Sequence, residues 1–188
     1  MPCIWIVSDT HFGHKNMAEV FTLADGSKCR PFATVEEHDA AMMERWNAVV
    51  RPQDHVWHLG DVAMDRQSLE RVVPRLHGHK RLVRGNHDIF KTATYLKVGF
   101  QEIRGCSVLN GMIFTHIPIH EQCLGRFKAN VHGHTHSQPN LGPRYLNVCV
   151  EQTEYRPLTL EEVMARVVKK TDGRIGDIKV FGGLTVCE

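Results

Sequence analysis

The sequence predicts a layered α/β fold, an α/β/β/α sandwich of two mixed sheets flanked by helices. Helices and strands alternate over the first half of the 188 residues, and expected strands cluster in the second half. This mixture fits two sheets packed face to face with helices outside. In addition, five short apolar runs each end in a residue that can bind a metal. Such runs are typical of buried strands that deliver side chains to one edge of a sheet.

The first half of the chain alternates between apolar runs and amphipathic stretches. Runs of β-branched and aromatic residues predict strands over residues 3–8, 55–59 and 80–84. Helices are expected over residues 14–21, 34–50 and 67–75, with Pro74 ending the third, and a weak helical pattern follows residue 88. Thr34 and Glu37 fit a capping box, in which each side chain satisfies a backbone N–H at the start of the second helix.

The second half of the chain is richer in strands. Residues 100–115 are expected to contain a hairpin, because Asn110-Gly111 between apolar residues is a strong turn signal. Further strands are expected near residues 129–133 and 145–150, a capped helix over 159–170, and one or two final strands within 175–186. No repeat or linker interrupts this pattern, so residues 1–188 are expected to form a single domain.

The composition is that of an ordinary globular protein, with 42% apolar and 23% charged residues. The net charge of +2 includes no block of like charge, so there is no clear electrostatic footprint of a nucleic acid. No apolar stretch reaches the length of a membrane span. The six cysteines contain no CxxC pair, and the first residues lack a signal peptide's features. We therefore expect reduced, mostly buried thiols and a cytoplasmic protein, whose oligomeric state the sequence does not indicate.

The residues that end the five apolar runs are the main functional signal. They are Asp9 and His11, Asp61, Asn86, His116, and His134 and His136. If the five strands share one sheet edge, these side chains converge on one point. Seven oxygen and nitrogen donors are too many for one tetrahedral ion and suit two ions that share a ligand. The sequence therefore predicts a two-metal hydrolase.

These motifs resemble those of the calcineurin-like metallophosphoesterases. The blocks are Asp9-x-His11, Gly60-Asp61, Gly85-Asn86-His87-Asp88, a later His116, and Gly133-His134-x-His136. They occur in the expected order, each after a predicted strand, and cover residues 9–136. The longer string from Ser8 to Asn16 is similar to a small, single-domain branch of the family found in bacteria and phages.

The resemblance implies a role for each block. Asp9, His11 and His136 would hold one metal, Asn86, His116 and His134 the other, and Asp61 would bridge both. A hydroxide bridging two divalent metal ions would then hydrolyse phosphate mono- or diesters. Manganese is the expected metal, and iron, nickel or zinc also suit this mixture of donors.

His87 is similar to the catalytic histidine of the family, which stabilises developing charge or protonates the leaving oxygen. A carboxylate should orient this histidine, and Asp65 and Asp88 are both candidates. Three glycines, Gly60, Gly85 and Gly133, are expected where the chain turns sharply to present ligands.

Other polar residues have weaker assignments. His14 and His120 could contact substrate, whereas His58 and His132 fall inside expected strands and should pack or support the ligands. Arg30 and Arg84 could bind a phosphate oxygen, although a solvated loop position for Arg30 and a sheet-edge salt bridge for Arg84 are slightly favoured. The remaining histidines, His38, His55, His77 and His79, are expected on the surface.

Two other functions fit the same fold. Phosphoprotein phosphatases, to which the chain is also similar, have the motifs Gly-Asp-x-x-Asp-Arg-Gly and Gly-Asn-His-Glu. In this chain Asp65-Arg66 comes one residue later than in the first motif, and Asp88 replaces the glutamate of the second. A small-molecule or nucleotide phosphoester is therefore expected as the substrate rather than a protein. A non-catalytic binding scaffold is the other alternative, and nothing selects it, because every ligand and His87 are present. At this length there is little room for a cap domain, so the site should be open.

Overall fold

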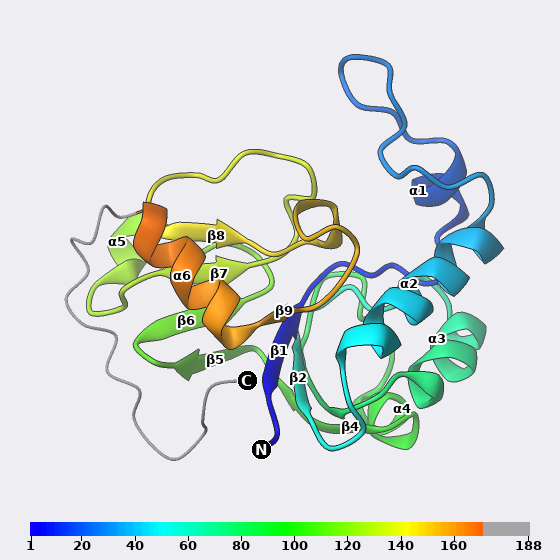
Figure 1. The fold of residues 1–188 in the computed structure, drawn as a ribbon, viewed down its shortest axis with the longest axis horizontal. Helices are drawn as coiled ribbons and strands as arrows, with labels where there is room; N and C mark the ends of the chain where they lie inside the picture. Colours follow the sequence, from blue (N-terminus) through cyan, green and yellow to red (C-terminus); the bar gives the residue numbers. More distant parts are fainter. Residues whose placement is uncertain (171–188) are drawn as a thin grey trace.

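The computed structural model describes residues 1–170, and its strands form two mixed sheets (Figure 1). The first sheet contains β1 (Ile4–Val7), β2 (His55–His58), β3 (His79–Val83), β4 (Phe100–Arg104) and β9 (Leu158–Thr159), in the order β4-β3-β2-β1-β9. Strands β1 to β4 are parallel, and β9 runs antiparallel to β1. The carboxyl ends of β1, β2 and β3 therefore meet at one edge.

The second sheet contains β5 (Cys106–Leu109), β6 (Met112–Thr115), β7 (Asn130–His132) and β8 (Tyr145–Asn147), in the order β5-β6-β7-β8. Strands β5 and β6 form the predicted hairpin, in which Asn110 and Gly111 both have positive φ, at 51° and 77°. Strands β6, β7 and β8 are parallel. Their carboxyl ends therefore also share one edge.

Alternation along β1 explains the layers. Ile6 packs between the sheets with Trp57, Phe114 and Val131, and the rings of Trp57 and Phe114 meet edge to face at 5.2 Å. Trp5, the neighbour of Ile6, instead packs in the cluster on the outer face of the first sheet. Successive strand residues point to opposite faces, so one strand serves both layers.

Most of the helices cover the outer faces of the sheets. They are α1 (Lys15–Glu19), α2 (Val35–Val49), α3 (Arg66–Val72), α4 (Thr92–Lys97), α5 (Glu121–Leu124) and α6 (Leu160–Lys170). Helices α2, α3 and α4 pack on the first sheet through residues such as Trp46, Leu69 and Tyr95 (Figure 1). Leu124 of α5 packs on the second sheet, and Val163 of α6 joins the core between the sheets. The layered α/β fold predicted from the sequence is confirmed.

Several local predictions are refined. Residues 145–150 do not form one strand, because β8 ends at Asn147 and Val150–Gln152 forms a 3-10 turn. The capping box of α6 is complete, since Thr159 and Glu162 exchange both hydrogen bonds. At α2, Glu37 instead accepts from the N–H of Ala33. The sequence did not predict α5 or β9, which have 4 and 2 residues. The strands expected within 175–186 lie outside the described residues.

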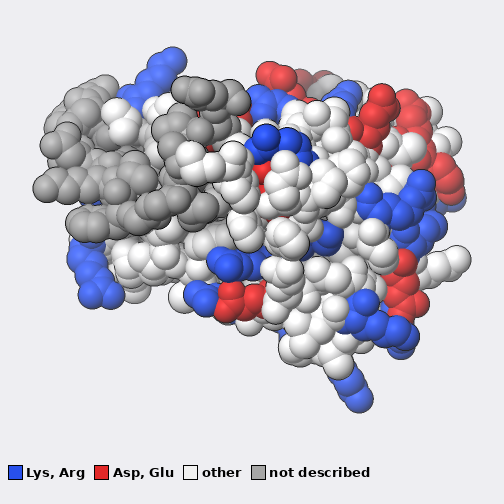
Figure 2. Space-filling view, turned by 60° about the horizontal axis from the view of Figure 1, so that its bottom comes forward, with Lys and Arg blue, Asp and Glu red and all other residues white. Residues whose placement is uncertain are grey.

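The cysteines differ in part from expectation. Cys29, Cys106, Cys123 and Cys149 are free thiols, and only Cys149 among these four is buried. Cys29 is partly exposed, and Cys106 and Cys123 are exposed, so the expectation of buried thiols is wrong for these three. Within residues 1–170, no helix is long and apolar enough to cross a membrane. Acidic and basic side chains are interspersed on the face shown in Figure 2.

Candidate metal centre

The predicted ligands come from loops that lie side by side at the carboxyl edge of both sheets. The loops after β1 and β2 are bonded to each other, since the N–H of His11 donates to the carbonyl of Asp61 at 3.0 Å. In the second sheet, the N–H of Gly133 donates to the carbonyl of His116 at 2.9 Å, which joins the loops after β6 and β7. Parallel pairing therefore brings together segments that are far apart in the sequence.

The side chains of these loops form overlapping groups that could each hold a metal. The groups are Asp9, His11 and Asp61; Asp61, His116 and His134; and Asp9, His136 and Cys149, with the ligand atoms of each group within 4.8 Å of one another. Asp61 belongs to two of them: its Oδ2 lies 3.6 Å from His11 Nε2 and 3.3 Å from His116 Nε2. Asn86 Oδ1 lies 2.9 Å from the same nitrogen of His116. All seven expected ligands thus lie around one centre.

The backbone is strained at these positions. Five of the seven expected ligands have a positive φ that non-glycine residues rarely adopt: Asp9 (59°), His11 (49°), Asp61 (58°), His134 (67°) and His136 (47°). Each such residue costs of order 1 kcal/mol or more, and such strain clusters at functional sites. The strands therefore end in conformations that aim side chains at the centre at a cost in stability.

Several polar atoms at the centre lack hydrogen bonds. Among the residues described, Asp9 Oδ1 and both ring nitrogens of His11 are buried without a partner. Buried polar groups are almost always hydrogen-bonded, and an unpaired one costs about 1–3 kcal/mol. Carboxylate oxygens and imidazole nitrogens are suitable ligands for a divalent transition metal. The residues present therefore fit a metal centre.

The charge states suit metal binding. Burial opposes ionisation of Asp9, but the adjacent His11 and the charges of His116 and His136 outweigh it and hold the pKa of this carboxyl far below its usual value. Burial also opposes ionisation of Asp61, and His116 and His11 again lower its pKa. Burial lowers the pKa of His11, which favours its neutral imidazole. Burial also opposes protonation of His116 and His136, but Asp61 and Glu151 respectively outweigh it and raise the pKa of each ring. Anionic carboxylates and neutral imidazoles are the forms that bind metal, so metal binding would displace protons from His116 and His136.

A family model of the calcineurin-like phosphoesterases matches residues 3–162 of the chain. The chain belongs to this family. Membership implies metal-dependent hydrolysis of phosphoesters.

Individual relatives add little about function. An uncharacterized protein from Methanocaldococcus jannaschii is 30% identical over 176 residues, which cover 88% of this chain and 92% of the relative. The gene 66 protein of Mycobacterium phage L5 is 40% identical over 89 residues, 45% of this chain and 39% of that protein. A solved structure of a protein of unknown function from Aquifex aeolicus covers 88% of this chain and 99% of its own, with a TM-score of 0.60 and 24% identity. This last similarity shows the fold alone.

In this calcineurin-like phosphoesterase, hydrogen bonds hold Oδ2 of Asp9 in place. Asp9 Oδ2 accepts hydrogen bonds from Ser8 Oγ at 2.6 Å, the N–H of His134 at 2.9 Å and Cys149 Sγ at 3.2 Å. Cys149 Sγ also accepts from the N–H of His136 at 3.2 Å. These donors turn Oδ1, the unpartnered oxygen, toward the centre. The sequence did not single out Cys149, because its contact with Asp9 depends on the pairing of the two sheets.

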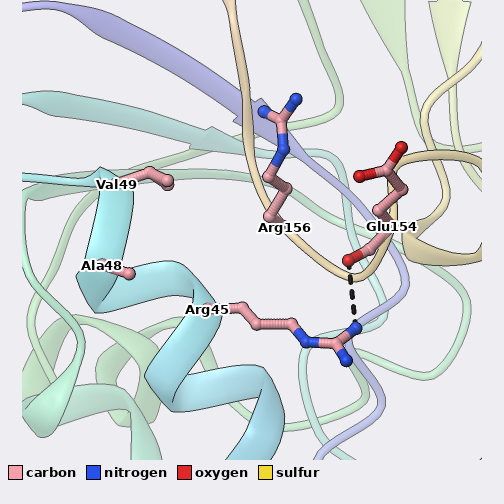
Figure 3. Close-up of a pocket in the computed structure, with 5 residues that line it drawn as sticks. All are labelled: Arg45, Ala48, Val49, Glu154 and Arg156. Atoms are coloured by element: carbon pink, nitrogen blue, oxygen red, sulfur yellow. Dashed lines mark hydrogen bonds between the residues drawn. The ribbon is translucent and has the colours of Figure 1, made fainter.

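Glu151 is a second residue that the sequence did not reveal. Its Oε1 accepts from His136 Nδ1 at 3.1 Å and from Arg30 at 2.7 and 2.9 Å. Since His136 donates from Nδ1, its Nε2 is left to face the centre, an arrangement common among metal-bound histidines. Glu151 lies in the 3-10 turn after β8, and the following loop is tied to α2 by a hydrogen bond from Arg45 to the carbonyl of Glu154 (Figure 3).

Arg30 supports the site from inside the protein. It is fully buried and donates to the carbonyls of Asp9 and Thr10 at 2.6 and 2.9 Å. The expected solvated position is therefore wrong. Arg30 also donates to His38 Nε2 at 2.7 Å, so the proton of His38 is on Nδ1, which donates to Asp39. His38 was expected on the surface but is fully buried in this network.

Neither candidate carboxylate contacts the His87 ring through a described hydrogen bond. Asp88 accepts from the backbone N–H groups of Asp61, Val62 and Gly85 at 2.8–3.1 Å, so it braces two ligand loops. Asp65 caps α3. The exposed His87 lies beside the centre with its ring 5.5 Å from that of His11, and its backbone N–H donates to Asp61 Oδ1.

The three glycines are required by close approach more than by turning. Only Gly60 has a positive φ, at 102°. A Cβ on Gly85 would lie 2.2 Å from Asp61 Oδ1, and one on Gly133 would lie 2.3 Å from Asp9 Oδ2. Both distances are far inside van der Waals contact, so these glycines make room for the ligand carboxylates.

The remaining candidates divide by position. His14 faces a pocket at the centre, with its ring 5.5 Å from that of His11. His120 instead caps α5 and lines another pocket. Arg84 forms no salt bridge within the described residues; it donates to the carbonyl of Phe90 and stacks on Tyr95.

The two histidines inside strands have structural partners. His58 is fully buried, and its Nδ1 accepts from the N–H of Gly60. Nε2 therefore carries the proton and donates to Thr10, and burial lowers the pKa of His58 to about 3. His132 is also buried and contacts the carbonyl of Gly133. Both support ligand loops, as the sequence indicated.

Proposed function

We propose that the protein hydrolyses phosphate mono- or diesters with two divalent metal ions. Asp9, His11 and His136 would hold one ion, Asn86, His116 and His134 the other, and Asp61 would be shared. The observation that carries this proposal is the position of Asp61 in two of the ligand groups, beside the unpartnered atoms of Asp9 and His11. Bound there, the two ions would acidify a water molecule and neutralise phosphate oxygens. Manganese is the proposed metal, and iron, nickel or zinc would also suit these donors.

The protein residues have distinct tasks in this proposal. Two carboxylates, Asp9 and Asp61, against two divalent ions leave a net positive centre that attracts a phosphate. Glu151 holds His136 in the tautomer that presents Nε2. His87 is exposed at the rim of the pocket, where it can donate a proton to a leaving oxygen.

The surroundings favour a small substrate. The pocket at the centre has a volume of about 520 Å³ and is lined by His11, His87 and His136. This size is typical of sites for small ligands. A small phosphoester or a nucleotide is therefore proposed rather than a protein.

The test is to strip the protein of metal, add Mn²⁺, and assay p-nitrophenyl phosphate and its bis ester. We expect turnover that requires metal. Asp61→Asn should lose at least about 100-fold in kcat, because one shared carboxylate orders both ions, while the surface control Glu70→Gln should be unchanged. The proposal fails if no ester is hydrolysed with Mn²⁺, Fe²⁺, Ni²⁺ or Zn²⁺. Full biological activity of Asp61→Asn would instead indicate a binding scaffold.

A further inference from the structure

One wall of the pocket at the metal centre contains none of the expected metal ligands or catalytic residues. The opposite wall, at the metal centre itself, contains His11, His87 and His136. The far wall is formed by residues of α1 and of the segment that follows it: Met17, Phe21, Thr22, Leu23 and Cys29. The pocket therefore extends from the proposed phosphate site to a mainly apolar surface.

This wall is a formed hairpin. Thr22 and Lys28 pair as an antiparallel bridge. The N–H of Leu23 donates to the carbonyl of Ser27 at 2.8 Å, and backbone bonds also link residues 21 and 29. The segment between α1 and α2 projects from the body of the protein (Figure 1). Because its backbone bonds are internal, the hairpin can present a fixed surface to a ligand.

The side chains of this wall suit a ligand that has a flat ring with polar edges. Phe21 and Leu23 are 45% and 38% exposed, so their apolar surface is free to be covered. The Phe21 ring meets that of His14 at 5.8 Å, and His14 in turn meets His11, which makes a continuous series of rings from hairpin to centre. Thr22, Ser137 and Gln138 supply hydrogen-bonding groups to the same pocket. Aromatic stacking combined with a few polar partners is the usual way to bind a nucleobase.

We propose that this wall binds the base of a nucleotide while its phosphate lies at the metal centre. Phe21 and Leu23 would pack against the base and thereby select nucleotides over other phosphoesters. The placement of the phosphate rests on the proposed function, whereas the contact between base and hairpin can be measured without turnover.

The test compares two monoesters that differ only in the base, adenosine 5′-monophosphate and ribose 5-phosphate, with the Mn²⁺-loaded protein. We expect a higher kcat/KM for the nucleotide. Phe21→Ala should reduce this preference about 5-fold or more, the usual range for losing one stacked base. The kcat/KM for ribose 5-phosphate should be the same in Phe21→Ala as in the wild type. Leu23→Ala provides a second variant, and Val20→Ala is the matched control, because Val20 is 60% exposed but does not line the pocket.

Binding of adenosine, measured by saturation-transfer NMR, separates the outcomes. Saturation of the base protons in the wild type that is lost in Phe21→Ala supports the proposal even if neither monoester is hydrolysed. Equal kcat/KM values for the two monoesters, or adenosine binding that neither variant changes, would overturn it. Failure of the proposed function is seen separately, as no metal-dependent hydrolysis of p-nitrophenyl phosphate or its bis ester.

Discussion

Replacing Glu151 by glutamine isolates the role of a buried charge behind the metal centre. Glu151 is 3% exposed and accepts hydrogen bonds from Arg30, which is fully buried, and from His136. Glutamine has the same shape and keeps one oxygen. The change therefore removes the negative charge that faces Arg30 without opening a cavity.

The magnitude follows from the pKa. Burial alone would raise the pKa of Glu151, but the charge of Arg30 and the bond from His136 lower it from 4.5 to about 2. Because the pKa is lower in the folded protein, this stabilisation is complete above pH 4.5 and is lost as the pH falls through 2. The difference corresponds to about 3 kcal/mol at pH 7 and to less than half of that, about 1 kcal/mol, at pH 3.

Urea unfolding with a chelator present, at pH 7 and pH 3, measures this difference without bound metal. Glu151→Gln should be less stable by about 3 kcal/mol at pH 7, and the gap should narrow at pH 3. Because His136 loses its anionic partner, Mn²⁺ affinity should also fall by about 10–100-fold. Glu70→Gln is the control, because Glu70 forms an exposed ion pair with Arg66. It should change the free energy of unfolding by less than about 1 kcal/mol. If Glu151→Gln and the wild type are equally stable at both pH values and bind Mn²⁺ with the same affinity, this role for Glu151 is refuted.

Two further changes test the supports of the ligands. Gly133→Ala should abolish metal binding measured by calorimetry, because the added Cβ would lie 2.3 Å from Asp9 Oδ2. Gly142→Ala is the control, because the nearest atom to its Cβ would be 3.7 Å away. Equal metal binding by the two variants would contradict this reasoning. Asp88→Asn should destabilise the protein by about 1–3 kcal/mol in urea, because the amide nitrogen cannot accept the backbone N–H bonds; normal stability with a selective loss of kcat would instead point to a role in catalysis.

The ligands could be predicted from the sequence because the pattern that reveals them is local. A short apolar run ending in Asp9 or Asp61 marks both a strand and its exit, and parallel pairing then brings the exits together. Pairing gathers the strand ends within each sheet, and the two sheets must then pack face to face to bring His116 and His134 to Asp61. The hairpin at Asn110-Gly111 was predictable for the same reason, since its turn conformation depends on those two residues.

The groups behind the ligands could not be predicted in this way. Glu151 and Cys149 reach Asp9 and His136 only after β8 joins the second sheet and the sheets pack together. Arg30 is separated from Glu151 by 121 residues, and nothing around it distinguishes a buried arginine from a solvated one. His38 lies on an amphipathic helix, where its burial depends on the partner that receives it.

The most direct test of a shared two-metal centre is the titration of metal-stripped protein with Mn²⁺, followed by electron paramagnetic resonance. We expect two Mn²⁺ ions per chain with a spin-coupled signal, because Asp61 would link them, and loss of the coupling in Asp61→Asn. One ion per chain, or two uncoupled ions in the wild-type protein, would contradict it.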